Sequence, residues 1–397
     1  MPPSRSRGRY EARGVSPAKE DVHKAVAGHA NLFSAAFCRV VPDFVAGGED
    51  WCNIIHADGC GTKSLVAYLW YRERGDAAVF EGLAQDSLAM NVDDLACAGA
   101  VSGILAANTI NRNPRRCGAE VLERLIHGAE LFAAKLRDLD CEVFIGGGET
   151  ADTPDLTPTF TLDSCAVARL RRSEVIRDGI TSGLAIVGLS STGRASFEDA
   201  ENSGMGSNGL TSARHDLLSS FYAKKYPETF DAGVDPSLVY AGPYRLEDPL
   251  PGSSLSVGAA LLSPTRSYAP VIARLLKDPA LRRAIRALVH CTGGGQTKCL
   301  RFAKSCHIIK DRTFALPPLF RAIRAASGST LEELARVFNL GWRLEVYCEP
   351  AAVSAVLAVA SSFGIEAREI GRTEAARGGT NRLSLRLEGE DIEIAGH

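Results

Sequence analysis

Residues 58–63 of the chain combine an acid, a flexible turn and a base in the sequence DGCGTK. A phosphate-binding P-loop needs a lysine directly after its last glycine, but here Thr62 separates Gly61 from Lys63. A dinucleotide-binding fingerprint also fails, because no glycine stands three residues after Gly61. The stretch can instead bring a Mg²⁺-binding carboxylate, Asp58, and a phosphate-binding ammonium, Lys63, to one place. On these residues alone, a solvated turn is an equally good interpretation.

Three aspartates lie within residues 81–98, a mostly apolar segment that we expect to be a helix. At about 100° per residue, Asp86 and Asp93 share one face of this helix, and Asp94 lies about 80° from Asp86. Carboxylates among apolar side chains are costly unless they are paired or bind a metal. The pattern therefore favours a functional role for these acids.

Three further glycine-rich stretches each carry polar side chains. They are residues 146–152 with Glu149 and Thr150, residues 204–214 with Ser207 and Asn208, and residues 290–298 with His290, Thr292 and Gly293 to Gly295. We expect a helix after the second and third stretches, and exposed N–H groups at a helix start bind anions. One glycine cluster alone is more often a turn. Four such stretches together indicate a phosphate-handling site.

Length and composition limit the class of protein. The chain has 397 residues, enough for about two or three domains, with 45% hydrophobic and 23% charged residues. Its net charge of −2 gives no overall attraction to nucleic acid or to a membrane surface, and no apolar run approaches the length of a membrane span. Eleven cysteines without any C-x-x-C pair suggest reduced, mostly buried thiols. We expect a cytoplasmic protein without nucleic-acid or membrane partners.

A change in composition near residue 172 predicts a boundary between two domains, 1–172 and 173–397. In the second domain, residues 193–257 are rich in Gly, Ser, Pro and Asp, and we expect a surface insertion with one helix within 212–226. The remaining residues alternate helical and strand patterns. This alternation predicts an α/β or α+β domain.

The sequence also contains seven motifs in a recognisable order: DGCGTK, AMNVDDL, GGGETAD, GSNG, SPTRSY, CTGGG and FNLGW. This ordered set resembles phosphoribosylformylglycinamidine cyclo-ligase, also known as aminoimidazole ribonucleotide synthetase, from about Tyr10 to Gly371. The resemblance implies a homodimer in which the N-terminal sheet pairs with that of a second subunit to form a barrel, followed by an α/β domain. It also implies an activity in purine biosynthesis: ATP and formylglycinamidine ribonucleotide give aminoimidazole ribonucleotide, ADP and phosphate.

The resemblance implies roles for individual residues. The catalytic candidates are Lys63, Asp94 and His290, with His290 as a proton carrier or, equally well, a structural histidine. The candidates for binding ATP are Asp58, Gly59, Gly61, Thr62, Lys63, Asp86, Gly147, Gly148, Glu149, Thr150 and Asn208. The candidate Mg²⁺ ligands are Asp58, Asp86, Asp94 and Glu149. The candidates for holding a substrate phosphate are Arg266, Gly293, Gly294 and Gly295.

Two positions depart from the family pattern. Gly206 stands where the shorter members usually have a histidine, and Asp93 replaces a usual asparagine. The alternatives are therefore another ATP-dependent enzyme of the same fold, such as a selenophosphate synthetase, or a non-catalytic nucleotide-binding relative. The earliest cysteine, Cys38, lies in an apolar context that does not suit a selenophosphate synthetase. Retention of the acids and of Lys63 argues against a non-catalytic protein.

Overall fold

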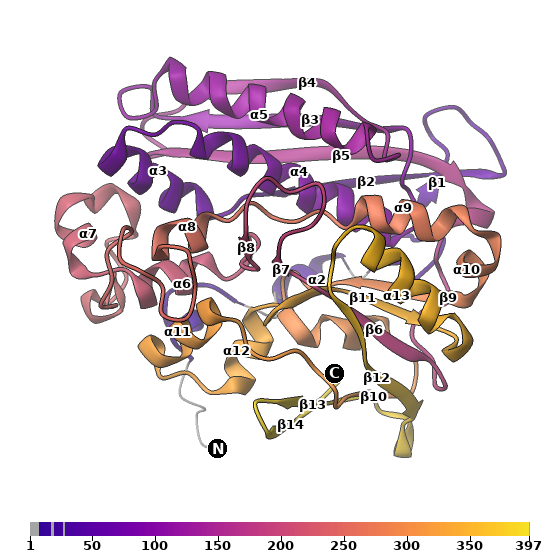
Figure 1. Cartoon of the computed structure of the whole chain (residues 1–397). Helices are drawn as coiled ribbons and strands as arrows, with labels where there is room; N and C mark the ends of the chain where they lie inside the picture. The colour runs from indigo at the N-terminus through magenta and orange to yellow at the C-terminus, as the bar shows by residue number, and fades with distance from the viewer. Residues whose placement is uncertain (1–7, 17–19, 27, 397) are drawn as a thin grey trace.

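Two β-sheets with flanking helices form the framework of the protein (Figure 1). The structure is a computed structural model and describes residues 8–16, 20–26 and 28–396. Within these residues the first sheet has five strands in the order β1-β2-β5-β3-β4. The second has seven strands in the order β14-β13-β10-β12-β6-β11-β9. Both sheets contain parallel and antiparallel neighbours, which confirms the expected mixed α/β class.

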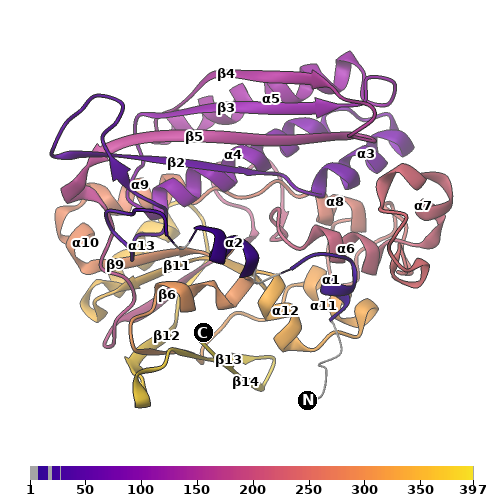
Figure 2. The same ribbon diagram turned by 180° about the vertical axis from the view of Figure 1, so that it is seen from behind.

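The first sheet comes from the N-terminal part of the chain. Its strands are β1 (Val41–Pro42), β2 (Trp51–Gly59), β3 (Ile104–Arg112), β4 (Val143–Asp152) and β5 (Phe160–Arg171). Its helices are α3 (Lys63–Arg74), α4 (Val79–Cys97) and α5 (Ala119–Arg137). Residues of β3 alternate between buried and exposed, so only one face of the sheet is covered. Figure 2 shows the other face, where none of the described helices lies over strands β2 to β5.

Helix α4 lies between the two halves of the protein. It packs on β2 and β5 on one side, and on α9 (Ala269–Lys277) and β9 (Ile285–His290) on the other. Fifteen of its 19 residues are therefore buried, and its three aspartates are among them. Because buried carboxylates need partners, the acids of α4 must be paired inside the protein.

The second sheet and its helices form the C-terminal part. The remaining strands of this sheet are β6 (Ala185–Ser190), β10 (Cys306–Lys310), β11 (Trp342–Cys348), β12 (Ala367–Ala375), β13 (Arg382–Leu387) and β14 (Glu390–Ala395). The helices here are α8 (Val257–Leu262), α10 (Pro279–Ala284), α11 (Pro318–Ser327), α12 (Leu331–Val337), α13 (Val353–Ser362) and the 3₁₀ helix η4 (Gly295–Phe302). All residues of β6 and β11 are buried, because these strands lie inside the sheet and both of its faces are covered.

Residues 193–257 differ from the expected surface insertion. They contain a two-stranded ribbon, two helices and two short 3₁₀ helices: β7 (Thr192–Gly193), β8 (Asn202–Ser203), α6 (Leu210–Leu217), α7 (Ser220–Lys225), η2 (Pro227–Thr229) and η3 (Pro236–Leu238). Helix α6 is largely buried against α8, α11 and the N-terminal helix α1 (Arg9–Ala12). The single helix expected within 212–226 is broken at Leu218. This region is therefore partly core, and the prediction of a surface insertion was wrong for α6.

Two local features frame the site region. Helix α3 ends at Gly75, which adopts the left-handed conformation with a φ of 70°. Residues 146–152 belong to the long strand β4. The described helices include none that is both long enough and apolar enough to cross a membrane.

Candidate functional site

The side chain of Asp94 is the centre of the charged cluster between the two sheets. Its Oδ1 lies 2.7 Å from Nδ1 of His290, and its Oδ2 lies 3.3 Å from Nε2 of His56. The ammonium of Lys298 is 4.0 Å from Oδ2. Burial alone would raise the pKa of Asp94, but Lys298 and the two histidines hold that pKa well below its usual range. Asp94 is therefore a carboxylate at neutral pH.

His290 has no free ring nitrogen. The ring is fully buried, its Nδ1 contacts Asp94, and its Nε2 accepts a hydrogen bond from Nε of Arg343 at 3.2 Å. Since the guanidinium can only donate, Nδ1 must carry the proton that His290 donates to Asp94. This placement fits a residue that positions Asp94, and it does not fit the expected role of His290 as a proton carrier.

His56 also contacts Asp94, although no sequence motif had indicated it. Its imidazole is 24% exposed, and Nδ1 lies 2.9 Å from Oδ1 of Asn91. Asn91 donates through Nδ2 to three carbonyl oxygens, so its Oδ1 is an acceptor and Nδ1 of His56 is the donor. The available signal was its position in β2, two residues before Asp58, where side chains of alternate residues face α4.

Lys63 and Asp86 form a second, fully buried ion pair of 2.8 Å. Lys63 also donates to the carbonyl of Ser263 at 2.6 Å, and Asp86 accepts from the backbone N–H and the hydroxyl of Thr265. Burial lowers the pKa of Lys63, and Asp86 opposes that shift. Neither side chain reaches solvent here, so direct contact of Lys63 with a phosphate does not fit this placement. The other oxygen of Asp86, Oδ2, is buried and has no hydrogen-bond partner among the described residues.

Arg266 is also engaged inside the protein. Its five N–H groups donate to both carboxylate oxygens of Glu198 and to three carbonyl oxygens. The guanidinium therefore has no donor left for a substrate phosphate, which does not fit its expected role. Asp93 is likewise structural, because it accepts from the hydroxyl of Ser267 and from two backbone N–H groups at the start of α9.

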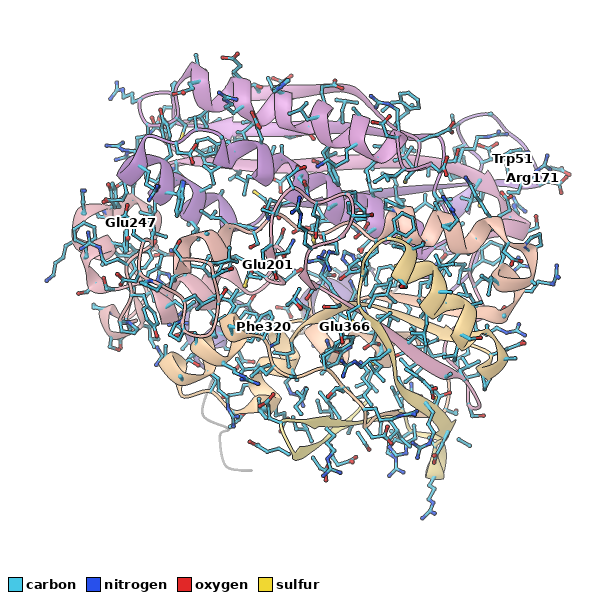
Figure 3. All side chains as sticks on the ribbon, in the orientation of Figure 1. Trp51, Arg171, Glu201, Glu247, Phe320 and Glu366 are labelled. Atoms are coloured by element: carbon cyan, nitrogen blue, oxygen red, sulfur yellow. The ribbon has the colours of Figure 1, made fainter. Side chains whose placement is uncertain are left out.

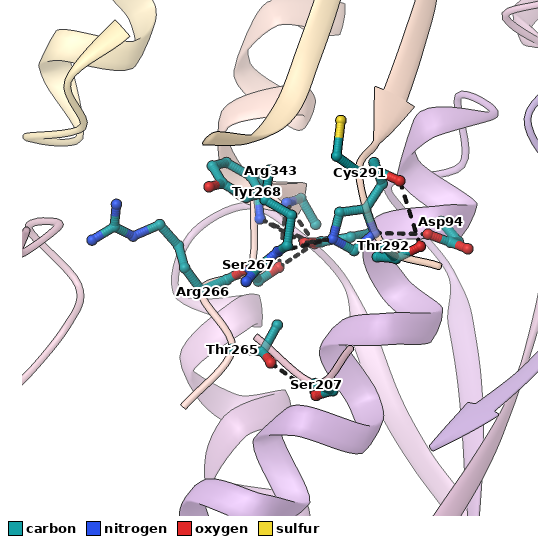
Figure 4. Close-up of polar contacts among 12 residues, drawn as sticks. Asp94, Ser207, Thr265, Arg266, Ser267, Tyr268, Cys291, Thr292 and Arg343 are labelled. Carbon is teal, nitrogen blue, oxygen red and sulfur yellow. Dashed lines mark hydrogen bonds and ion pairs between the residues drawn. The ribbon is translucent and has the colours of Figure 1, made fainter. Parts of the chain in front are cut away.

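Three of the four glycine-rich stretches lie together. The hydroxyls of Thr62 and Thr211 are 2.9 Å apart, which joins residues 58–63 to α6. A Cβ on Gly293 would lie 3.9 Å from Nδ2 of Asn208, so residues 204–214 and 290–298 are also neighbours. Ser207 bonds to Thr265 at 3.0 Å (Figure 4). The expected groups Gly59, Gly61, Thr62, Asn208 and Gly293 to Gly295 thus belong to one region.

The remaining glycine-rich stretch, residues 146–152, lies on the edge strand β4. Residues 147–150 are exposed there, and no hydrogen bond or ion pair described links them to Asp94 or Lys63. By register, Glu149 and Asp163 lie on either side of Thr109 in one row of the sheet. Burial, and then the nearby Asp58, raise the pKa of Asp163. Asp163 is a further acid that the sequence analysis did not single out.

The four acids expected to bind Mg²⁺ do not form one cluster. Asp58 and Glu149 are exposed near the end of the first sheet, whereas Asp86 and Asp94 are buried in separate ion pairs. No group of three or more His, Cys, Asp or Glu side chains in the described part of the chain could hold a metal ion. Two carboxylates still have coordinating capacity: the exposed Asp58 and the unpartnered Oδ2 of Asp86. Mg²⁺ commonly uses one or two carboxylates together with phosphates and water, so the exposed Asp58 suits it, whereas Asp86 lies as deep as Lys63.

Comparison with known proteins covers both halves of the chain. Residues 35–170 match the family described as "AIR synthase related protein, N-terminal domain", and residues 181–383 match "AIR synthase related protein, C-terminal domain". The chain belongs to the AIR synthase-related family.

Two curated relatives carry the name of the same enzyme. The phosphoribosylformylglycinamidine cyclo-ligase of Pyrococcus furiosus is 32% identical over 72% of this chain and 69% of its own length. That of Methanocaldococcus jannaschii is 26% identical over 81% of this chain and 78% of its own length. Among solved structures, the thiamine monophosphate kinase of Aquifex aeolicus (ThiL) has a TM-score of 0.52 at 12% identity, covering 95% of this chain and 98% of its own. The last likeness establishes a common fold alone.

Proposed function

We propose that the protein is an ATP-dependent cyclo-ligase that converts formylglycinamidine ribonucleotide to aminoimidazole ribonucleotide, with release of ADP and phosphate. The observation that carries this proposal is the match to both family domains in order, with relatives of this activity over most of their length. The convergence of residues 58–63, 204–209 and 291–295 supplies the glycine-rich surroundings that phosphate groups require.

The reaction needs positioning and charge neutralisation more than a covalent enzyme group. ATP phosphorylates the amide oxygen of the substrate, which is otherwise a poor leaving group, and the substrate's own nitrogen then closes the ring. The carboxylate of Asp94 is held rigidly by His290 and can orient groups at the reaction centre. Cys60 is a bystander, because its thiol is buried and burial raises its pKa, so no thiolate nucleophile is available.

A Mg²⁺ ion would neutralise phosphate charge when bound with ATP. The residue that suits it is the exposed Asp58, and the buried Oδ2 of Asp86 has no hydrogen-bond partner among the described residues. Lys63 then acts by holding Asp86 in place through the 2.8 Å ion pair. An ATP analogue, AMPPCP, is bound in a solved structure of AaThiL, whose fold is similar. This supports nucleotide binding here.

We also propose a homodimer joined through the open face of the first sheet. One row across that face contains Ile55, Val167, Leu105 and Phe144. Three of these side chains are 46–62% exposed, although they are large and apolar. A contiguous exposed apolar surface on a sheet is typical of a protein interface. Arg171 stacks 4.7 Å from the ring of Trp51 at one end of the sheet and gives this surface a polar margin (Figure 3).

A coupled assay for ADP release, with and without formylglycinamidine ribonucleotide, tests the proposed activity. We expect ADP release that depends on the ribonucleotide, with aminoimidazole ribonucleotide formed in equal amount. ADP release with thiamine monophosphate in place of the ribonucleotide would favour a different enzyme of the same fold. Nucleotide binding without turnover would favour the non-catalytic alternative.

The buried, unpaired cysteines support a cytoplasmic location.

A further inference from the structure

The backbone around Arg343 is distorted in a way that redirects this side chain. Arg343 is the extra residue of a β-bulge, because Trp342 pairs with Ser190 while Leu344 pairs with the adjacent Leu189. The preceding Leu340 has a φ of 55°, in the left-handed region that side chains other than glycine rarely adopt. Bulges and strained residues occur together where a side chain must take an unusual direction, frequently at functional sites.

The guanidinium of Arg343 is buried beside His290, which in turn contacts Asp94. The residue is 2% exposed. Its Nε donates to His290, its Nη2 donates to the carbonyl of Arg266, and its charge lies 5.4 Å from the ring centre of Tyr268 (Figure 4). Among the residues that the structure describes, Nη1 has no hydrogen-bond acceptor. Nη1 is not among the fully enclosed side-chain atoms that lack a partner, so this donor is accessible and can bind an anion.

Gly206 provides the space that the guanidinium occupies. A Cβ on residue 206 would lie only 2.8 Å from Nη1 of Arg343, and Gly206 has a φ of 70°. Asn339 fastens the two segments together, since its Nδ2 donates to the carbonyls of Gly204 and Met205. Its Oδ1 accepts from the N–H of Gly341, two residues before Arg343. Arg343 and the glycine-rich residues 204–209 thus form one rigid unit.

We propose that Arg343 binds phosphate oxygens at this site and takes the place of a side chain at position 206. The proposal rests on the proposed function, because it assigns Arg343 to the phosphate groups of that reaction. A planar guanidinium with free N–H groups binds phosphate more specifically than an ammonium does. Ser207 and Asn208, which follow Gly206 in the chain, add polar side chains to this segment. The phosphate belongs either to ATP or to the ribonucleotide, and both present the same chemistry to Arg343.

Two variants test the proposal. In Arg343→Gln we expect at least a tenfold weaker binding of one phosphate ligand, either AMPPCP or formylglycinamidine ribonucleotide, measured by calorimetry. The other ligand should bind within about threefold of the wild type. Arg343→Lys should recover only part of the loss, because the charge returns without the planar fork. Gly206→Ala leaves Arg343 in the chain but displaces its guanidinium, and should weaken the same ligand.

A matched control separates binding from folding. Arg214 is also buried: its Nη1 donates to the carbonyl of Thr229 and to the hydroxyl of Tyr240, and its Nε is enclosed without a hydrogen-bond partner among the described residues. It therefore tests whether an unpaired buried donor alone makes an anion site. Arg214→Gln should lower the melting temperature without selective loss of either ligand. If Arg343→Gln does not fold, Gly206→Ala and Arg343→Lys carry the test. Unchanged affinity for both ligands in folded Arg343 and Gly206 variants would overturn the proposal.

Failure of the proposed function remains distinguishable. If the wild-type protein releases no ADP with formylglycinamidine ribonucleotide, the cyclo-ligase activity is refuted. AMPPCP and inorganic phosphate still probe Arg343 in that case. A tenfold loss of either in Arg343→Gln would support the anion site by itself, and equal affinity in wild type and variant would refute it.

Discussion

His215 should make the stability of the protein depend on pH, and the size of the effect follows from its surroundings. The ring is buried in α6, and Nδ1 accepts from the backbone N–H of Tyr240 at 3.0 Å. Burial, followed by the charges of Arg214 and Arg13, lowers the pKa of His215 to about 2. The unfolded chain binds a proton near pH 6.5 and the folded chain does not. Stability is therefore fully present above pH 6.5 and is lost as the pH falls toward 2.

The variant His215→Asn retains an acceptor for Tyr240 and removes the titration. At pH 5 the wild type should have lost about 2 kcal/mol through this one group, relative to pH 8. The assay is urea denaturation of both proteins at several pH values between 8 and 5, followed by circular dichroism. The stability difference between the two should change by about that amount over the series. His127→Asn, at an exposed position on α5, is the control and should track the wild type.

A pH-independent difference between wild type and His215→Asn would refute this reasoning. It would mean that His215 is protonated to the same extent in the folded and unfolded chains. Because α6 follows directly after residues 204–209, loss of its packing should also reduce activity at acid pH.

The remaining predictions concern the site and the assembly. Asp94→Asn should leave a folded protein whose kcat for ADP release falls about 10²- to 10³-fold, and near-normal kcat would remove Asp94 from the site. Lys63→Met should cost roughly 3–5 kcal/mol of stability, because it leaves the carboxylate of Asp86 buried without its cation. Thermal denaturation measures this loss, and an unchanged melting temperature would count against the ion pair. Cys60→Ala should keep kcat within a few-fold in the same ADP assay, whereas a dead variant would point to a covalent mechanism. Leu105→Asp should dissociate the proposed dimer, as measured by the molar mass in light scattering. Ile126→Asp, at a similar exposure on the helical side, should leave the dimer intact, and a monomeric wild type would refute the interface.

The sequence determined the local elements and the family. Helix α3 ends at Gly75 because a glycine accepts the left-handed conformation there, and that rule depends on one residue. The apolar helix α4 was also predicted from the sequence, because side-chain periodicity is a local property. The seven motifs identified the family because their order does not depend on how the chain folds.

Only the tertiary structure decided which charged groups are free. Arg266, Lys63 and His290 resemble phosphate or proton ligands by type, yet each is buried and paired with partners inside the protein. His290 lies 196 residues from Asp94 in the chain, and Lys63 lies 200 residues from the carbonyl of Ser263. Conversely, Arg343 has a free donor because a bulge and a glycine from a distant segment meet beside it. Hydrogen-bonding capacity and burial are set by neighbours in space, and separations of this length leave no local pattern in the sequence.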